Sequence, residues 1–501
     1  MDQNKKFADE APPLDDQLKR SQTFAFACSI LACMTSILLG YDIGVMSGAA
    51  IFIQRDLKIN DVQLEVLVGV INLYCLIGSA AAGRTSDWIG RKMTIVLACS
   101  IFFLGSMLMG PFAFNYGMLM FGRFIAGIGM GFALMIAPVY TAELAPAAAR
   151  GFLSSFPEVF INLGILLGYV SNWCFSHLSL QLGWRVMLGI AAAPSIIMGF
   201  GVLAMPESPR WLVLKGRLGD AREILIKTSP TKEEAETRLV AIKEAAGIPL
   251  DCTDDICAVP KVEKGHEVWK ELFVHPTKAV RNILIAGIGI HFFQQTSGID
   301  AVVLYSPRIF KKAGIVTENA LLGCTVGVGV MKTLCILIAS YFLDRVGRRP
   351  LLLGSVAGMI VSVTLLATGL TIVDQNPDKK ISWAIALCLV MTLAYVGFFS
   401  LGLGPVTWVY SSEIFPLKLR AQGTSAGVAV NRVFSGVISM TFLSLSKAIT
   451  IGGAFYLFAC VGVIAWVFFY TCLPETRGVN LEEIEALFGD EQEKQAKKTV
   501  T

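Results

Sequence analysis

The chain alternates long apolar runs with short charged segments. Twelve of these runs carry few charges and are about 20 residues or longer, which is enough to cross a bilayer as a helix. They lie at 23–46, 62–83, 93–112, 115–140, 152–174, 184–205, 280–305, 320–343, 350–373, 382–410, 421–446 and 451–473. This pattern predicts an all-α membrane protein with twelve transmembrane helices.

The longest polar segment inside this pattern, residues 206–279, separates six predicted spans from six. Within it, stretches 220–227 and 233–246 have the pattern of surface helices, on which the Lys and Glu side chains would face water. We therefore expect five parts: an N-terminal tail at 1–22, a six-helix bundle at 23–205, a linker at 206–279, a second six-helix bundle at 280–473 and a C-terminal tail at 474–501.

Short charged motifs occur twice, once in each half, with the same spacing from acid to base. The matched sets are Asp87 and Arg91 with Asp344 and Arg348, Glu143 and Arg150 with Glu413 and Arg420, and Glu207 with Glu475. A membrane chain built from two matched halves is typical of a transporter that rocks about a central site.

These charged residues lie at the ends of predicted spans, where side chains four apart on a helix can pair. We expect ion pairs that link helices of one half on the cytoplasmic side, hold the carrier outward-facing, and separate as it turns inward. Positive-inside anchoring alone is the other interpretation of the same charges.

Composition agrees with a membrane protein, since 54% of residues are hydrophobic and only 16% are charged, against about 25% in soluble domains. The net charge of +4 is too small to indicate nucleic-acid binding. The 12 cysteines form no CxxC pair, and most read as small buried hydrophobes. Cys252 and Cys257 lie in the polar linker, and their spacing leaves open whether they form a disulfide. We expect no metal and no cofactor.

Orientation follows from basic residues. The short loops carry similar numbers of Lys and Arg on both sides, so the balance rests on the basic tails and linker. Both termini and the linker are therefore expected in the cytoplasm. The polar segment 1–20 does not have the pattern of a cleaved signal peptide.

Four motifs taken together resemble the sugar porter family of the major facilitator superfamily. They are D-R-x-G-R-R at 344–349 with its first-half counterpart, P-E-S-P-R-W at 206–211, P-E-T-R-G at 474–478, and Q-Q-T-S-G-I-D at 294–300. The resemblance covers residues 40–478 and is greatest to the plant polyol and monosaccharide carriers. It implies two pseudo-symmetric six-helix bundles, a monomer, and proton-driven uptake at the plasma membrane, although no motif distinguishes plasma from vacuolar membrane.

Asp42 lies deep in the first predicted span, and Arg123 in the fourth is its natural partner. A carboxylate inside the bilayer is costly and marks a functional site. Burial favours its neutral form and a nearby guanidinium its charged form, so a change in separation would change its affinity for a proton. Proton-coupled sugar porters resemble this chain in having an acid here, whereas facilitative glucose carriers have an amide. The alternative is a static ion pair.

A polyhydroxylated substrate requires donors, acceptors and a flat apolar surface. Gln294 and Gln295 in the seventh span and Asn431 in the eleventh supply both hydrogen-bonding partners without charge. Trp408 follows a Gly-Pro segment in the tenth span that can break the helix. By resemblance, these four match the sugar-contacting positions of the family. Each can also be read as interhelical packing.

Three positions that are usually neutral in the family are charged here, namely Glu158, Asp300 and Lys332. Neither Asp300 nor Lys332 would readily stay charged in the membrane alone, so we expect the two to compensate one another across the cavity. Glu158 is expected to share Lys332 or to accept hydrogen bonds from substrate hydroxyl groups.

Three further departures remove two aromatic rings and one acid, so the pocket as a whole is charged and less aromatic. Leu39 replaces an aromatic residue, Ser400 replaces a common acid, and Leu304 replaces one of two tyrosines, leaving Tyr305. Such a pocket suits flexible polyols at least as well as a pyranose ring, so we do not expect strict hexose selectivity.

Other functions remain open at this stage. A facilitative uniporter with a structural Asp42 is one, and a non-transporting sugar sensor is another, although the short tails disfavour a sensor. An enzyme is disfavoured because the sequence has no P-loop, metal cluster or Ser/His/Asp arrangement. His291, like the other histidines, is isolated, and it either lines the vestibule or is packed.

Overall fold

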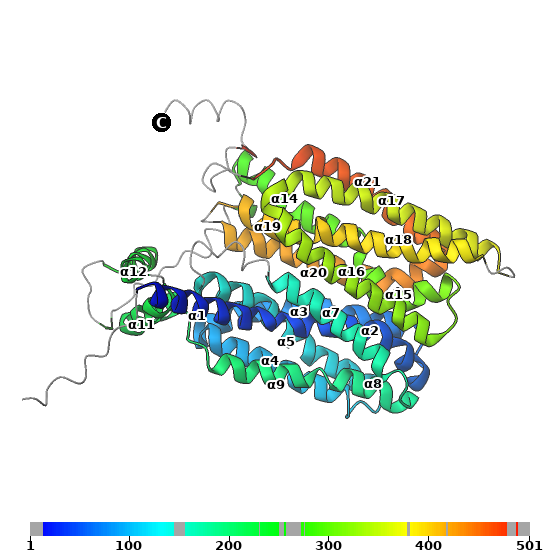
Figure 1. The fold of residues 1–501 in the computed structure, drawn as a ribbon, viewed down its shortest axis with the longest axis horizontal. Coiled ribbons are helices and arrows are strands. Elements are labelled where there is room, and N and C mark those ends of the chain that lie inside the picture. The colour runs from blue at the N-terminus through cyan, green and yellow to red at the C-terminus, as the bar shows by residue number, and fades with distance from the viewer. Residues whose placement is uncertain are drawn as a thin grey trace, which may run out of the picture.

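The computed structural model describes residues 14–144, 156–229, 231–249, 255–256, 272–274, 276–377, 381–416, 419–477 and 487–488, with only the backbone for 14–22, Ala245 and Asp344. The named elements within these ranges are all helices. Figure 1 shows the helices of the first half, blue to green, lying alongside those of the second half, green to red.

The described residues of the first half form eight helices. They are α1 (Leu14–Met34), α2 (Ser36–Leu57), α3 (Asp61–Ile89), α4 (Arg91–Met109), α5 (Tyr116–Leu144), α7 (Phe156–Phe175), α8 (Leu180–Gly189) and α9 (Ala192–Leu203). Between the halves, the part of the linker that the structure describes forms three short helices, α10 (Pro209–Leu214), α11 (Leu218–Thr228) and α12 (Lys232–Ala246). We call the end of the bundles that carries these three the linker end, and the opposite end the far end (Figure 1).

The second half also holds eight helices among its described residues. They are α14 (Lys278–Thr296), α15 (Ile299–Lys312), α16 (Glu318–Val346), α17 (Arg348–Gln375), α18 (Ser382–Leu401), α19 (Leu403–Ile414), α20 (Arg420–Ile449) and α21 (Ile451–Cys472).

Eleven spans in the described part of the chain are long and apolar enough to cross a membrane. The one predicted span missing from these eleven, the seventh at 280–305, is divided into α14 and α15 at Gly298, which has a φ of 89°. A side chain here would meet both the left-handed backbone and the Phe458 ring, 2.6 Å from an added Cβ, so glycine is required. The prediction of an all-helical membrane protein is confirmed.

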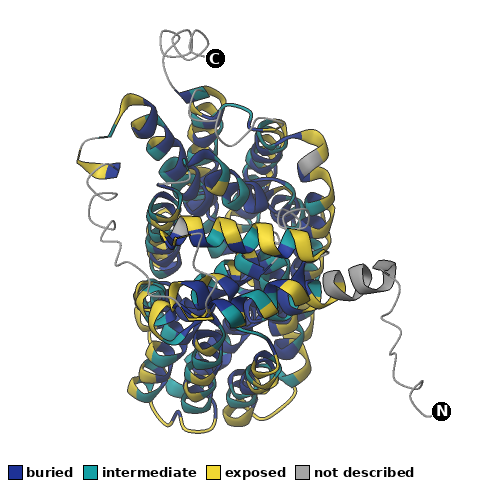
Figure 2. Ribbon diagram, turned by 90° about the vertical axis from the view of Figure 1, so that its left-hand side faces the viewer, coloured by how far each residue is buried: buried dark blue, intermediate teal, exposed yellow. Residues whose placement is uncertain are grey.

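The outer surface of both bundles is apolar. Figure 2 shows buried residues concentrated inside the bundles and where they meet, with exposed residues along the outside. Large exposed hydrophobic side chains such as Phe200, Val361 and Ile464 lie on this outside surface. An apolar exterior of this kind suits contact with lipid.

Polar contacts tie the two halves together at the far end. The carboxylate of Asp61 on α3 binds the ammonium of Lys447 on α20, and its Oδ1 lies 3.5 Å from Arg308 Nη1 on α15. Arg55 on α2 forms an ion pair with Glu318 on α16. The structure therefore represents a conformation in which the far end is closed.

Replacing Asp61 should loosen this closure. Asp61→Asn removes the carboxylate shared by Lys447 and Arg308, and exposed ion pairs contribute only about 0.2–1 kcal/mol each. The variant should therefore stay folded while the far end opens more often. We expect faster hydrogen–deuterium exchange at the start of α3 and the end of α20. Asp220→Asn, which removes a linker ion pair to Arg217, is the control, and unchanged far-end exchange would contradict the assignment.

Candidate functional site

A buried ion pair joins α2 to α5 inside the first half. Arg123 Nη1 lies 2.6 Å from Asp42 Oδ2 and 2.8 Å from Oδ1, and both residues are no more than 2% exposed. Arg123 Nε donates to the carbonyl oxygen of Leu67 at 3.1 Å. The structure thus brings together the acid and base expected from the sequence. Removing one member of such a pair leaves an uncompensated charge, at a cost of about 3–5 kcal/mol.

The three expected amides form one cluster in the second half. Asn431 Nδ2 donates to Gln294 Oε1 at 2.7 Å, and Gln295 Nε2 donates to Asn431 Oδ1 at 3.1 Å. Gln294 Nε2 in turn donates to the carbonyl oxygens of Leu403 and Gly404, at 3.3 and 3.1 Å. These carbonyls lie where the tenth predicted span breaks between α18 and α19, so the amides also hold the broken helix in place.

Most of the hydrogen bonds that these three amides can make are therefore already formed with other groups of the protein. The exception is the Oε1 atom of Gln295, which is buried and has no hydrogen-bond partner among the described residues. Trp408 is half-buried and packs edge-on against His291, with 5.2 Å between ring centroids. His291 is fully buried and both ring nitrogens lack a partner among the described residues, so it is a packed histidine beside the cluster.

The three charged departures come from three helices, with Glu158 on α7, Asp300 on α15 and Lys332 on α16. Lys332 is 8% exposed, and its ammonium lies 6.0 Å from the ring centroid of Phe399. Asp300 accepts a hydrogen bond from Ser435. Within the described residues, Lys332 makes no ion pair shorter than 4.0 Å, yet the charges of both acids act on it. Lys332 and Asp300 are therefore not in direct contact in this conformation, and charge compensation between them stays a prediction.

The remaining expected substrate positions differ from one another in their surroundings. Ser400 is 1% exposed, and its hydroxyl has no partner among the described residues. Leu39 is buried. Tyr305 is also buried, and its hydroxyl donates to the carbonyl oxygen of Ser439 at 2.7 Å while its ring stacks on Phe442. The Tyr305 hydroxyl is thus already bonded within the protein.

Sequence reasoning missed Arg432 and Glu65. Arg432, 8% exposed, donates from Nη2 to Asn431 Oδ1 at 2.7 Å. Glu65 is 1% exposed and accepts a hydrogen bond from the backbone nitrogen of Ser444 in the other half at 2.7 Å. Both lie inside predicted spans, so the cost of a charge in the membrane, which identified Asp42, was the signal that could have found them.

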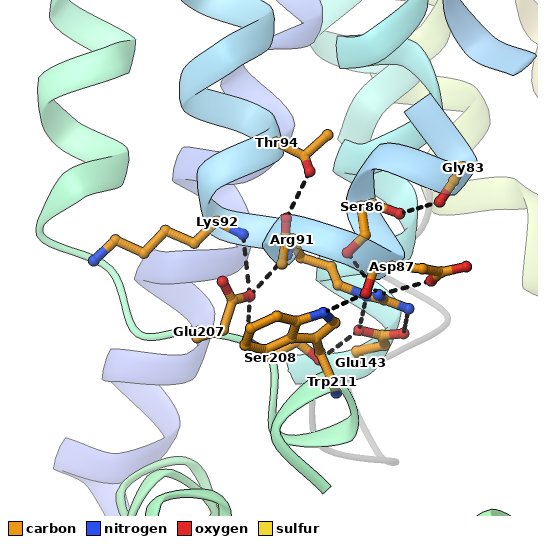
Figure 3. A network of polar contacts seen from close by, with 11 residues as sticks. Gly83, Ser86, Asp87, Arg91, Lys92, Thr94, Glu143, Glu207, Ser208 and Trp211 are labelled. Atoms are coloured by element: carbon orange, nitrogen blue, oxygen red, sulfur yellow. Dashed lines mark hydrogen bonds and ion pairs between the residues drawn. The ribbon is translucent and has the colours of Figure 1, made fainter. Parts of the chain in front are cut away.

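The linker-end motif of the first half is a compact polar network (Figure 3). Arg91 donates from Nε to Glu143 Oε2 at 3.1 Å and from Nη1 to Asp87 Oδ1 at 3.0 Å. Glu207 Oε1 accepts from the backbone nitrogens of Arg91 and Lys92, at 2.9 and 3.1 Å. Glu207 therefore caps the N-terminus of α4, where backbone donors lack partners in the helix.

The second half repeats this network. Arg348 Nη2 donates to Glu413 Oε1 at 2.8 Å. Glu475 accepts from the backbone nitrogens of Arg348 and Arg349, at 3.0 and 2.9 Å, and so caps α17. Each of these ion pairs lies within one half. Of the other expected gate residues, Arg420 donates from Nε to the Phe415 carbonyl at 3.3 Å.

Two expected gate residues cannot be placed in these networks. Arg150 and the side chain of Asp344 lie outside the described residues, as do Cys252 and Cys257. The role of the whole set as a gate stays a prediction.

Two matched helical halves, each with a buried polar centre, are the arrangement typical of a secondary transporter. The "Sugar (and other) transporter" family model matches residues 28–488. Polyol transporter 5 of Arabidopsis thaliana is 64% identical over 470 residues, which are 94% of this chain and 87% of the relative. The glucose transporter GlcP of Staphylococcus epidermidis is 34% identical, over 91% of this chain and 95% of the relative.

Solved structures agree with this assignment. The major facilitator proton:xylose symporter XylE, bound to 6-bromo-6-deoxy-D-glucose, has a TM-score of 0.75 and 27% identity, covering 93% of this chain and 99% of that one. A partially occluded inward-open form of XylE from E. coli has a TM-score of 0.76 and 26% identity, covering 91% and 100%. The chain belongs to the sugar transporter family of the major facilitator superfamily. The expected fold is confirmed, and the relatives are transporters rather than enzymes, as predicted.

Replacing Gly90, the glycine just before the capped helix α4, should lower the stability of the protein. Gly90 has a φ of 98°, and an added Cβ would lie 2.3 Å from Glu207 Oε2. Gly90→Ala should therefore combine backbone strain with loss of the cap, at about 1–3 kcal/mol, and lower the apparent Tm of the purified protein. Gly247→Ala is the control, since Gly247 has a φ of 71° with nothing within 4 Å of an added Cβ. Equal Tm losses in both variants would contradict the role of Glu207.

Proposed function

We propose that this protein is a proton-coupled symporter that takes up polyols, and also monosaccharides, by alternating access. The observation that carries the proposal is the buried Asp42–Arg123 pair, at 2.6 Å, in a chain of this family. The 64% identity to a polyol transporter and the likeness to a proton:xylose symporter support the substrate class and the coupling ion.

Asp42 is proposed to carry the proton. Each of its two carboxylate oxygens accepts a short hydrogen bond from Arg123 Nη1. Protonation would therefore neutralise the carboxylate and weaken the bridge between α2 and α5. The helices could then rearrange at lower cost. If the protonated form binds substrate more tightly, substrate must by linkage also promote protonation.

The substrate is proposed to contact the polar atoms that remain available near the amide cluster. These are Gln295 Oε1, the Ser400 hydroxyl, the Lys332 ammonium, and the carboxylates of Glu158 and Asp300. A polyol has a hydroxyl on each carbon, which donates to a carboxylate and accepts from an ammonium. Trp408 supplies an apolar face, while Gln294 and Asn431 position the others.

The linker end and both tails are proposed to face the cytoplasm, in a monomer at the plasma membrane. The basic residues of the tails and linker support this orientation. The far end then faces outside, and the contacts of Asp61 close the external side. The duplicated networks around Arg91 and Arg348 brace each half at the cytoplasmic end.

One observation favours a second candidate, a facilitative uniporter. The Asp42–Arg123 pair is fully buried and well bonded, as a purely structural bridge would be. The two candidates differ in whether substrate movement carries charge and responds to external pH.

Transport currents test the proposal. In a transport-null cell, sorbitol and mannitol should produce inward currents that grow as external pH falls, because a proton enters with each substrate. Asp42→Asn should abolish the current and uphill accumulation, while exchange of labelled sorbitol continues. The panel also includes xylitol, inositol, glucose and fructose as competitors.

Three results would count against the proposal. Full accumulation by Asp42→Asn would remove Asp42 from coupling, and sorbitol uptake without current would favour the uniporter. Competition by glucose alone would defeat the polyol assignment. Asp56→Asn, which breaks an ion pair to Arg185 within the first half, is the matched control and should keep the current.

A thermodynamic cycle tests the shared charge compensation. Lys332→Met should weaken sorbitol binding, and its effect should be non-additive with Asp300→Asn and with Glu158→Gln, because both acids act on Lys332. Coupling above about 0.5 kcal/mol in each cycle is expected, measured from the KM for sorbitol. Additivity in both cycles would reject the arrangement.

A further inference from the structure

Two helices from opposite halves, α3 and α20, pack closely along one seam. An added Cβ on Gly69 of α3 would lie 2.4 Å from Met440 Cγ. On α20, an added Cβ on Gly436 would lie 3.4 Å from the side chain of Leu73 and 3.6 Å from Asn72 Cβ. Glycines at these positions let the two backbones approach, as small residues do between membrane helices.

Polar contacts follow this seam from the far end inward. Asp61 binds Lys447 at the far end, and the buried Glu65 binds Ser444 next. Further inward, Arg432 Nη1 lies 3.5 Å from Asn72 Oδ1. Of these three contacts, the innermost belongs to a residue that also contacts the amide cluster.

Arg432 is held mainly by its neighbour in that cluster. Its Nη2 and Nε atoms donate to Asn431 Oδ1 at 2.7 and 3.1 Å. Arg432 is 8% exposed, and no carboxylate of a described residue lies within ion-pair distance of its guanidinium, although its charge acts on Glu158. A buried guanidinium with only neutral partners is costly to keep.

The contact with Asn72 is at the long limit for a hydrogen bond. It therefore favours the closed seam only weakly, which suits a carrier that must open this seam in every cycle. Opening would take Asn72 away from Arg432 and leave the guanidinium with Asn431 alone. The amide cluster and the seam are thus joined through one side chain.

We propose that Arg432 is a positioning residue that links occupancy of the amide cluster to closure of the external seam, through Asn431 on one side and Asn72 on the other. The inference rests on the proposed transport function. If Arg432 has this role, the strength of its contact with Asn72 sets how often the binding site faces outside.

Substitutions of Asn72 should move this equilibrium in opposite directions. Asn72→Asp places a carboxylate beside the guanidinium, which stabilises the closed seam. The outward-open population falls, so the external KM for sorbitol should rise roughly fivefold and Vmax should fall. Asn72→Ala weakens the closed seam, so the external KM should fall and the KM for efflux from loaded vesicles should rise. A merely structural role would shift both KM values of a variant in the same direction.

The Arg432→Gln background supplies the decisive comparison. Without the guanidinium, Asn72→Asp should no longer raise the external KM above that of Arg432→Gln alone. Arg185→Gln, which removes an arginine within the first half, is the control and should leave the response to Asn72→Asp intact. If Asn72→Asp does not reach the membrane, the opposite KM shifts of Asn72→Ala alone decide.

Two outcomes would overturn the proposal. One is an Asn72→Asp effect that persists in Arg432→Gln, and the other is a shift of both KM values of Asn72→Ala in one direction. Both are measured in carriers that transport sorbitol, so they differ from failure of the proposed function, in which the unmodified protein moves no polyol.

Discussion

The cost of burying charge and polar groups away from water governs this structure. The bilayer interior offers no solvent to satisfy a carboxylate, a guanidinium or a freed carbonyl, so each requires a partner from the protein. Asp42 has Arg123, and the carbonyls at the break before α19 have the amide of Gln294. Where partners are incomplete, as at Lys332 and Gln295 Oε1, polar capacity is left over, and this is the capacity that we propose a solute uses.

The same constraint explains why the two halves can move as units. At the linker end, Glu207 and Glu475 satisfy the backbone donors that open α4 and α17. These networks lie within each half and need no contact across the molecule. Contacts between the halves are mixed: the ion pair of Arg55 with Glu318 is exposed and the Arg432–Asn72 contact is long, while the buried Glu65 accepts a hydrogen bond from Ser444. Polar networks closed within each half, with a limited set of polar contacts between the halves, suit rocking about a central site.

Sequence reasoning succeeded where the chemistry of one residue type decides the outcome. A lone acid in an apolar run needs a base, which led from Asp42 to Arg123. A repeated acid-to-base spacing indicated that Arg91 and Arg348 occupy equivalent networks, and both pair with the expected glutamates. It did less well where one group has several possible partners. Tyr305 was expected at the substrate, but its hydroxyl is bonded to the Ser439 carbonyl.

The sequence by itself determined the number of apolar spans, their duplication, and which polar residues must lie inside the membrane, because length, periodicity and charge cost are local properties of a chain. Only the tertiary structure decided how those residues divide their bonds. The amides bond mainly to one another, Lys332 lies beyond ion-pair distance of any carboxylate in the described residues, and Arg432 connects Asn431 to Asn72 across the halves. These choices depend on distances between helices far apart along the chain, and hydrogen bonds and ion pairs change over a few tenths of an ångström.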